Sequence, residues 1–203
     1  DAIPKPAVKI QPDWSSSEPW PCTVFGEPVY NKHDDKHNII RKYSGFMVYY
    51  DDQILSPRWT AIKITKEIAD KNPDIRRPKR FKTDPELKQK GCNTTTHDDY
   101  KNPSGTMVWS RGHMVQFDDA RGYGQQAAED SFYTANVCPQ LAALNGQAWL
   151  SLEKLCTEYA RDYAVVWIYT GPIYSEIKPF APDRKIPAPT AFYKVVVSPA
   201  KEG

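Results

Sequence analysis

One histidine and several polar side chains lie among apolar residues in the second half of the chain. His113 follows Arg111 by two residues in the run W-S-R-G-H-M. Asn136 and Asn145 follow at wide spacing, and Glu153 lies eight residues after Asn145. These residue types are uncommon in a hydrophobic core, so their apolar surroundings indicate a chemical site.

The same residue types suit the hydrolysis of a phosphodiester. A neutral histidine can take a proton from water at pH 7, and a divalent cation can neutralise charge on the pentacovalent phosphate and on the leaving oxygen. The carbonyl oxygen of Asn145 is a hard neutral donor suited to Mg²⁺, and the carboxylate of Glu153 could orient water around the ion. The residues therefore predict a metal-dependent nuclease, with Mg²⁺ as the expected ion and Mn²⁺ or another divalent cation as alternatives.

A strand–strand–helix unit is predicted to bring these side chains together. His113 ends one predicted strand, Asn136 lies on the next, and Asn145 opens an amphipathic helix, where it could instead be only an N-cap. Glu153 lies just over two helical turns after Asn145 and therefore faces the same side. Arg111 would share a strand face with His113, where its guanidinium could bind phosphate through two hydrogen bonds.

The remaining pattern predicts one α+β domain, an antiparallel sheet with helices on both sides. Residues 1–42 are rich in proline and are expected to form an arm, anchored by Trp14 and Trp20, that packs on a domain of residues 43–203. His33 and His37 have the i, i+4 spacing that could bind a metal ion, although a solvated polar turn is the favoured explanation. The predicted strands and helices cover residues 45–50, 59–64, 106–110, 133–137, 163–169 and 191–197 (strands), and 125–132 and 145–162 (helices).

Residues 66–105 are expected to form a long loop with little regular structure and a local positive charge. The net charge of the whole chain is only +2, but seven basic residues fall between residues 76 and 90. Such a patch can hold a phosphate backbone, although a solvated loop has the same composition. These basic residues are Arg76, Arg77, Lys79, Arg80, Lys82, Lys88 and Lys90.

The cysteines bear on the location of the protein. Cys22, Cys92, Cys138 and Cys156 form no C-x-x-C pair, which argues against a zinc knuckle. Their even number permits two disulfides of undetermined pairing; a bridge between Cys138 and Cys156 would brace the site helix, and two buried thiols are the alternative. No stretch has the apolar length of a membrane span. With a chain that starts at Asp1 rather than methionine, these features favour an exported protein, secreted or periplasmic.

Three motifs in the central stretch resemble the DNA/RNA non-specific endonuclease family, the endonuclease G-like ββα-metal (His-Me finger) nucleases. The motifs are W-S-R-G-H-M at 109–114, F-Y-T-A-N-V-C-P-Q at 132–140 and L-N-G-Q-A-W at 144–149, which is followed by Leu152-Glu153. Further similar runs, such as W-T-A-I-K-I-T at 59–65 and F-K-T-D-P at 81–85, extend the resemblance from about residue 43 to the C-terminus. The resemblance implies an antiparallel sheet flanked by helices, with a ββα-metal unit as the active site.

The resemblance also implies a role for each site residue. His113 matches the general base, Asn145 the ligand of a single Mg²⁺, and Glu153 the carboxylate that holds a water of that ion. Asn136 matches an active-site asparagine that supports the histidine and the phosphate, and Arg111 matches the arginine of the signature. The reaction implied is the cleavage of DNA or RNA to products that carry a 5′-phosphate.

Some positions depart from the family pattern. Members place an arginine before the F-K-T-D-P run; Arg77, Lys79 or Arg80 could fill that place, so Arg77 and Arg80 are predicted to bind substrate. An arginine one turn after the carboxylate in some members is Thr157 here, and Arg161 lies one turn further on. Most members continue beyond the last strand of this chain, which is therefore expected to be a short variant or to lack a C-terminal part. Members are often dimers, so a homodimer is a further alternative.

Two other functions stay open at this point. The chain could be a relative that binds nucleic acid without cutting it, although it retains His113, Asn145 and Glu153. It could also be a phosphodiesterase for another substrate, or a toxin that needs a partner; the basic loop favours a polymer. Substitution of His113 distinguishes them, because a nuclease would lose cutting and keep binding.

Overall fold

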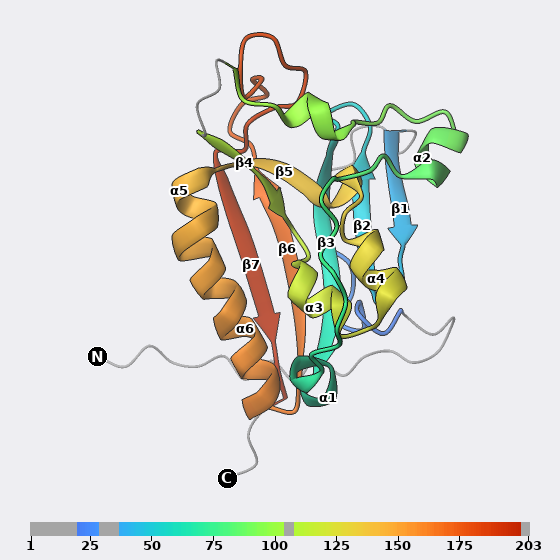
Figure 1. The fold of residues 1–203 in the computed structure, drawn as a ribbon, viewed down its shortest axis with the longest axis vertical. Coiled ribbons are helices and arrows are strands. Elements are labelled where there is room, and N and C mark those ends of the chain that lie inside the picture. The colour runs from blue at the N-terminus through green and yellow to red at the C-terminus, as the bar shows by residue number, and fades with distance from the viewer. Residues whose placement is uncertain (1–19, 29–36, 104–107, 200–203) are drawn as a thin grey trace.

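A five-stranded antiparallel sheet with the strand order β1-β2-β3-β6-β7 is the scaffold of the molecule (Figure 1). The structure is a computed structural model, and it describes residues 20–28, 37–103 and 108–199. A separate two-stranded antiparallel ladder, β4–β5, lies in front of the sheet in Figure 1. The strands are β1 (Asn38–Lys42), β2 (Phe46–Asp51), β3 (Ser56–Thr65), β4 (Trp109–His113), β5 (Val137–Leu141), β6 (Val165–Ile173) and β7 (Ala191–Val197).

The two faces of the sheet are covered by different parts of the chain. Successive side chains of β2 point to opposite faces: Phe46 and Val48 join a core cluster that includes residues of the helices, whereas Met47 packs with Trp59 and Cys22. Among the residues with described positions, this second cluster contains no helical residue. The expectation of helices on both sides is therefore not met in the described residues: their helices cover one face, and the segment at residues 20–28 packs on the other.

Most helices are short, and one long helix lies along the sheet beside β7 in Figure 1. Helix α6 approaches β6 and β3 closely because its inward positions Cys156 and Ala160 are small and fully buried. Leu155 and Tyr159, two apolar residues of the helix predicted to be amphipathic, are exposed. The helical elements are α1 (Lys66–Asp70), α2 (Pro85–Gln89), η2 (His97–Tyr100), α3 (Phe117–Arg121), α4 (Gln125–Asp130), η4 (Thr134–Asn136), α5 (Ala142–Leu144), η5 (Asn145–Trp149) and α6 (Leu150–Asp162).

Three local predictions differ from the structure. A strand was predicted at 133–137, but Thr134–Asn136 forms a 3-10 turn and the strand that follows continues through Pro139. Proline fits there because a short outer ladder does not need its missing N–H. The long loop at 66–105 contains the short helices α1, α2 and η2. Residues 38–42, expected within the arm, form β1 of the sheet.

The predicted anchors of the arm are described in part. Trp20 packs against the cluster around Trp59, and the indole Nε1 of Trp167 donates to the carbonyl oxygen of Pro21 at 2.9 Å. Trp14 and His33 lie outside the described residues. His37 Nδ1 lies 2.8 Å from a carboxylate oxygen of Asp52.

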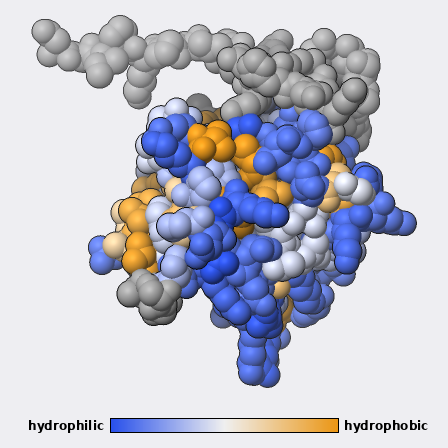
Figure 2. All heavy atoms as spheres, turned by 90° about the horizontal axis from the view of Figure 1, so that it is seen from above, coloured by the Kyte–Doolittle hydropathy of each residue, from blue (hydrophilic) through white to orange (hydrophobic). Residues whose placement is uncertain are grey.

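All four cysteines carry free thiols, so the structure does not support the disulfides that their even number permits. No helix in the described part of the chain has both the length and the apolar character needed to cross a bilayer. Seen from above, the surface is mainly hydrophilic and carries only small, separate hydrophobic areas (Figure 2).

Candidate active site

A cavity of about 180 Å³ brings four of the predicted site residues together. His113 enters it from the end of β4, Asn145 from η5, and Glu153 from α6. Arg77 lines it from the basic segment before Phe81. The spacing argument for Asn145 and Glu153 is thus confirmed in the sense that both face one cavity.

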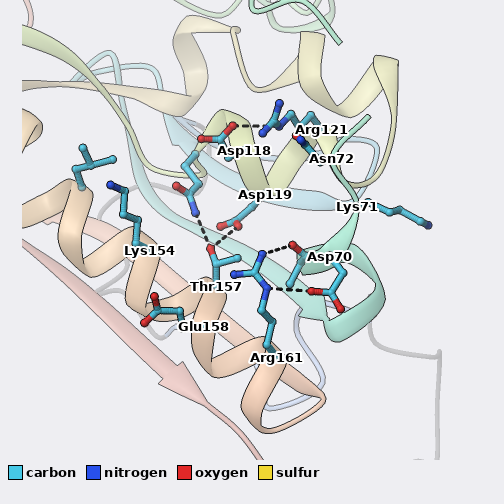
Figure 3. A pocket seen from close by; sticks show the side chains of 13 residues that line it. Asp70, Lys71, Asn72, Asp118, Asp119, Arg121, Lys154, Thr157, Glu158 and Arg161 are labelled. Carbon is cyan, nitrogen blue, oxygen red and sulfur yellow. Dashed lines mark hydrogen bonds and ion pairs between the residues drawn. The ribbon is translucent and has the colours of Figure 1, made fainter. Parts of the chain in front are cut away.

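A larger cavity of about 500 Å³ lies next to this one and shares Gln116, Asp118 and Leu150 with it. Two ion pairs lie within its walls, Asp118 with Arg121 and Asp70 with Arg161 (Figure 3). The predicted base, metal ligand and carboxylate, His113, Asn145 and Glu153, line the smaller cavity.

His113 is held in its neutral form by its surroundings. Its side chain is 8% exposed, and its imidazole centroid lies 4.9 Å from those of Phe81 and Phe132. Burial, and then the positive charge of Arg77, lower the pKa of His113 to about 3. No described residue is hydrogen-bonded to its buried Nε2. A neutral imidazole with a free ring nitrogen is the form that can accept a proton.

Asn145 begins a π-helical turn, η5, and such turns are frequent at functional sites. Its backbone is helical (φ −59°, ψ −44°), and its side chain caps no helix, so the N-cap alternative is not observed. Its Nδ2 donates to Oε1 of Gln140 at 2.6 Å. Within the described chain no group is hydrogen-bonded to Asn145 Oδ1, which leaves this carbonyl oxygen available for a ligand.

Glu153 is a buried carboxyl group with a perturbed acidity. It is 8% exposed, and burial, only partly offset by the positive charge of Lys194, raises its pKa to about 7; the nearby Asp119 adds to the rise. Lys194 is half-buried, its ammonium donates to Thr170 Oγ1 at 3.0 Å, and desolvation lowers its pKa. The structure thus places a half-buried cation close enough to act electrostatically on Glu153.

Asn136 lies at the base of the site and is fully buried. Its side-chain carbonyl accepts from the backbone N–H of Val115 at 2.9 Å, and its amide donates to the carbonyl oxygens of Val115 and Ser131, each at 2.9 Å. These bonds fix the chain just after His113. Asn136 is therefore placed to support the histidine; it does not line the cavity that would receive a phosphate.

Two predicted arginines lie outside the cavity. Arg111 donates through Nε and Nη2 to the carbonyl oxygen of His97, at 3.2 and 3.0 Å. Arg80 forms an exposed ion pair with Asp98 at 3.0 Å. Of the three candidates for the position before the F-K-T-D-P run, the structure thus places Arg77 in the site.

Two residues next to the site, Gln140 and Lys194, were not predicted from the sequence. Gln140 is the last residue of the quoted F-Y-T-A-N-V-C-P-Q run, so the motif contained it without suggesting a contact with Asn145. Lys194 lies in the last strand, in the midst of apolar residues, and a lysine at such a position is the signal that could have revealed it.

Comparison with known proteins identifies the family. Residues 26–203 match the model of the family described as DNA/RNA non-specific endonuclease. The chain belongs to this family. Its members are metal-dependent nucleases that act on nucleic acid.

Several relatives in the DNA/RNA non-specific endonuclease family are similar to most of the chain. A nuclease EXOG, mitochondrial, of Danio rerio is 30% identical over 173 residues, which are 78% of this chain and 47% of that protein. The mitochondrial nuclease of Saccharomyces cerevisiae is 32% identical over 169 residues, 76% of this chain and 49% of that protein. A human endonuclease G, mitochondrial, is 28% identical over 174 residues, 81% of this chain and 56% of that protein. The chain thus spans about half the length of these relatives.

A solved structure of this family supports the fold. A chain from the crystal structure of an EndoG/EndoGI complex superposes with a TM-score of 0.68 at 24% identity, covering 90% of this chain and 75% of that one. The α+β fold with its antiparallel sheet is thereby confirmed.

The expected export of the protein is wrong. The relatives above carry mitochondrial names, which point to the mitochondrion rather than to secretion or the periplasm. The argument for export depended on a cysteine count that permits disulfides, whereas all four thiols are free.

Proposed function

We propose that this chain is a metal-dependent endonuclease that hydrolyses phosphodiester bonds in DNA, RNA or both, with little sequence preference and with 5′-phosphate products. One observation carries the proposal: a neutral histidine, an unbonded asparagine carbonyl oxygen and a buried carboxyl group share one cavity of about 180 Å³. Family membership and the names of the relatives, all nucleases, support it.

The residues present fit a hard divalent cation. Asn145 Oδ1 and the carboxylate of Glu153 are oxygen donors, the type that Mg²⁺ prefers. No cluster of three or more His, Cys, Asp or Glu side chains suited to a metal occurs in the parts of the chain with described positions. The site is therefore suited to an ion held directly by Asn145, with water in the remaining positions and Glu153 as an acceptor for that water. When bound, such an ion would offset negative charge on the phosphate and on the leaving oxygen.

His113 acts as the general base. Its neutral Nε2 has no hydrogen-bond partner in the described part of the chain and can take the proton of a water molecule that attacks phosphorus. The pKa of His113, about 3, applies to the protein without bound substrate. An anionic phosphodiester beside the ring would raise this pKa because it stabilises the imidazolium, which brings the base closer to its working range. Phe81 and Phe132 hold the ring in one orientation and exclude water from its faces.

Arg77 and the basic segment supply attraction for a phosphate backbone. All seven basic residues between 76 and 90 are exposed, and Arg77 faces the cavity itself. Contacts of this kind go to phosphate rather than to base edges, so they carry no sequence information. Binding and cutting are accordingly expected to weaken steeply as salt increases.

A short duplex of defined sequence tests the reaction type. With Mg²⁺, the products should be fragments with 5′-phosphate and 3′-hydroxyl ends, identified by mass spectrometry, and EDTA should suppress them. Fragments with 3′-phosphate ends would contradict the proposed chemistry. Binding without cleavage in any divalent cation would favour the alternative of a non-catalytic nucleic-acid-binding relative. Parallel runs with an RNA duplex and with light scattering would determine the substrate preference and whether the chain is a homodimer.

A further inference from the structure

A buried glutamine holds the side chain of Asn145 in place. We propose that Gln140 is a positioning residue, which fixes the amide plane of Asn145 so that its carbonyl oxygen faces the cation site. This inference rests on the proposed function, because it assigns Gln140 a part in holding the proposed metal ligand.

The geometry gives Gln140 control of the Asn145 amide. Gln140 pairs with Ser110 in the β4–β5 ladder, and its side chain is fully buried. Its Oε1 accepts from Asn145 Nδ2 at 2.6 Å. Because an amide group is planar, a hydrogen bond to its nitrogen also sets the direction of its oxygen. Rotation of the Asn145 amide by half a turn would place its Oδ1 against Gln140 Oε1. Two acceptor oxygens would then face each other, so this rotation is disfavoured.

The amide nitrogen of Gln140 does not explain why a glutamine stands at this position. Its Nε2 is buried and has no partner in the described residues. A buried amide donor without a partner costs free energy, and an apolar side chain of the same shape would avoid that cost. The bond to Asn145 is thus the feature that a glutamine provides and a methionine would lack.

Gly112 provides the space that Gln140 occupies. A Cβ atom on Gly112 would lie 2.5 Å from Gln140 Oε1 and 2.7 Å from Gln140 Cβ. The φ of Gly112 lies outside the left-handed region, so its backbone does not require glycine. The glycine between Arg111 and His113 is explained by packing: it lets Gln140 cross the strand beneath the site and reach Asn145.

Metal binding separates a positioning role from a purely structural one. Gln140→Met keeps the volume of the side chain and removes the acceptor. Its Mn²⁺ affinity, measured by electron paramagnetic resonance without substrate, should fall at least about tenfold, in the range typical of partners that orient metal ligands. Its melting temperature in EDTA should stay the same or rise, because the unpaired donor is gone. Gly112→Ala should weaken Mn²⁺ binding as well, since it displaces the same side chain.

Three proteins serve as references in this experiment: the wild type, Asn145→Ala and Gln126→Met. Gln126→Met makes the same chemical change at an exposed position on α4, where the glutamine bonds Asp130, and should bind Mn²⁺ like the wild type. If Gln140→Met binds Mn²⁺ within about twofold of the wild type while Asn145→Ala does not bind, the positioning role is overturned and the proposed metal ligand stands. If the wild type and Asn145→Ala bind Mn²⁺ equally, Asn145 is no ligand, and the proposed function and the role of Gln140 both fail.

Discussion

The ring of Phe81 lies 4.9 Å, centroid to centroid, from the imidazole of His113. This contact packs the basic segment, residues 76–90, against the histidine proposed as the general base. The neighbouring Lys82 is bound to the segment that precedes β5 by two backbone hydrogen bonds. Its N–H donates to the carbonyl oxygen of Phe132 at 2.9 Å, and its carbonyl oxygen accepts from the N–H of Thr134 at 2.8 Å. Arg77, four residues before Phe81 in the same segment, lines the cavity.

His113→Ala should abolish cutting while leaving nucleic-acid binding in place. The account gives His113 the task of accepting a proton, and loss of a general base typically lowers the rate by about 10²–10⁴-fold. The turnover number should fall by this amount, whereas the dissociation constant for a DNA duplex, measured in EDTA, should change little. His37→Ala is the matched control, because His37 contacts Asp52 and does not line the cavity. Normal cutting by His113→Ala would remove the proposed base.

Arg77→Ala should weaken substrate binding more than Arg80→Ala does. Arg77 lines the cavity, whereas Arg80 is paired with Asp98 outside it. Loss of one phosphate contact is expected to reduce the slope of log affinity against log salt by about 1. Removal of the Arg77 charge should also raise the pKa of His113, which NMR titration of the imidazole can follow. Equal losses of affinity in the two variants would contradict this assignment.

Glu153→Gln should stabilise the metal-free protein and weaken its activity. The glutamate ionises near pH 4.5 in the unfolded chain and near pH 7 in the folded protein. Between these values the folded state keeps a proton that the unfolded chain has lost, so this carboxyl makes stability fall as pH rises through the window. Glutamine does not titrate, and the variant should gain up to roughly 3 kcal/mol over the wild type at pH 8 and nothing at pH 4.

Urea unfolding in EDTA at these two pH values measures the difference. Activity should fall about tenfold or more, because the neutral amide is a weaker acceptor for water around a cation. A variant that is less stable than the wild type at pH 8 would show that the Glu153 carboxylate is not strained by burial.

Asn136→Ala should destabilise the fold. The substitution removes a fully buried amide that forms three hydrogen bonds, and it leaves the carbonyl oxygens of Val115 and Ser131 and the N–H of Val115 without that partner. The expected loss is about 3 kcal/mol or more in the free energy of unfolding. Chemical denaturation measures it directly. Unchanged stability together with lost activity would instead place Asn136 in the chemistry.

The predicted site residues that the structure brings to one cavity are mainly those with chemically distinctive types at regular spacing. His113 at a strand end, with Asn145 and Glu153 on one face of a helix, could be located because strand and helix periodicities are local properties. Arg77 could not be separated from Arg80, because the path of an irregular segment depends on long-range contacts such as that of Phe81 with His113. The bond that turns Arg111 toward His97 likewise joins distant segments.

The fold was predictable to a similar extent. The strands at 45–50, 59–64, 163–169 and 191–197 match observed strands to within a few residues. Which face receives the helices was not predictable, because β2 and β3 are buried on both faces and therefore lack a clear alternation. The exposure of Leu155 and Tyr159 was not predictable from the apolar pattern of the helix, because small residues, Cys156 and Ala160, occupy the inward positions of α6.

Plasmid nicking tests the central claim most directly: Asn145 holds the cation that cutting requires. Supercoiled plasmid is incubated with the wild type or Asn145→Ala, in Mg²⁺ and in EDTA, after circular dichroism has shown that both are folded. The account predicts that the wild type cuts in Mg²⁺ and not in EDTA, and that Asn145→Ala cuts in neither. Equal cutting by both proteins in Mg²⁺, or cutting by the wild type that persists in EDTA, would contradict it.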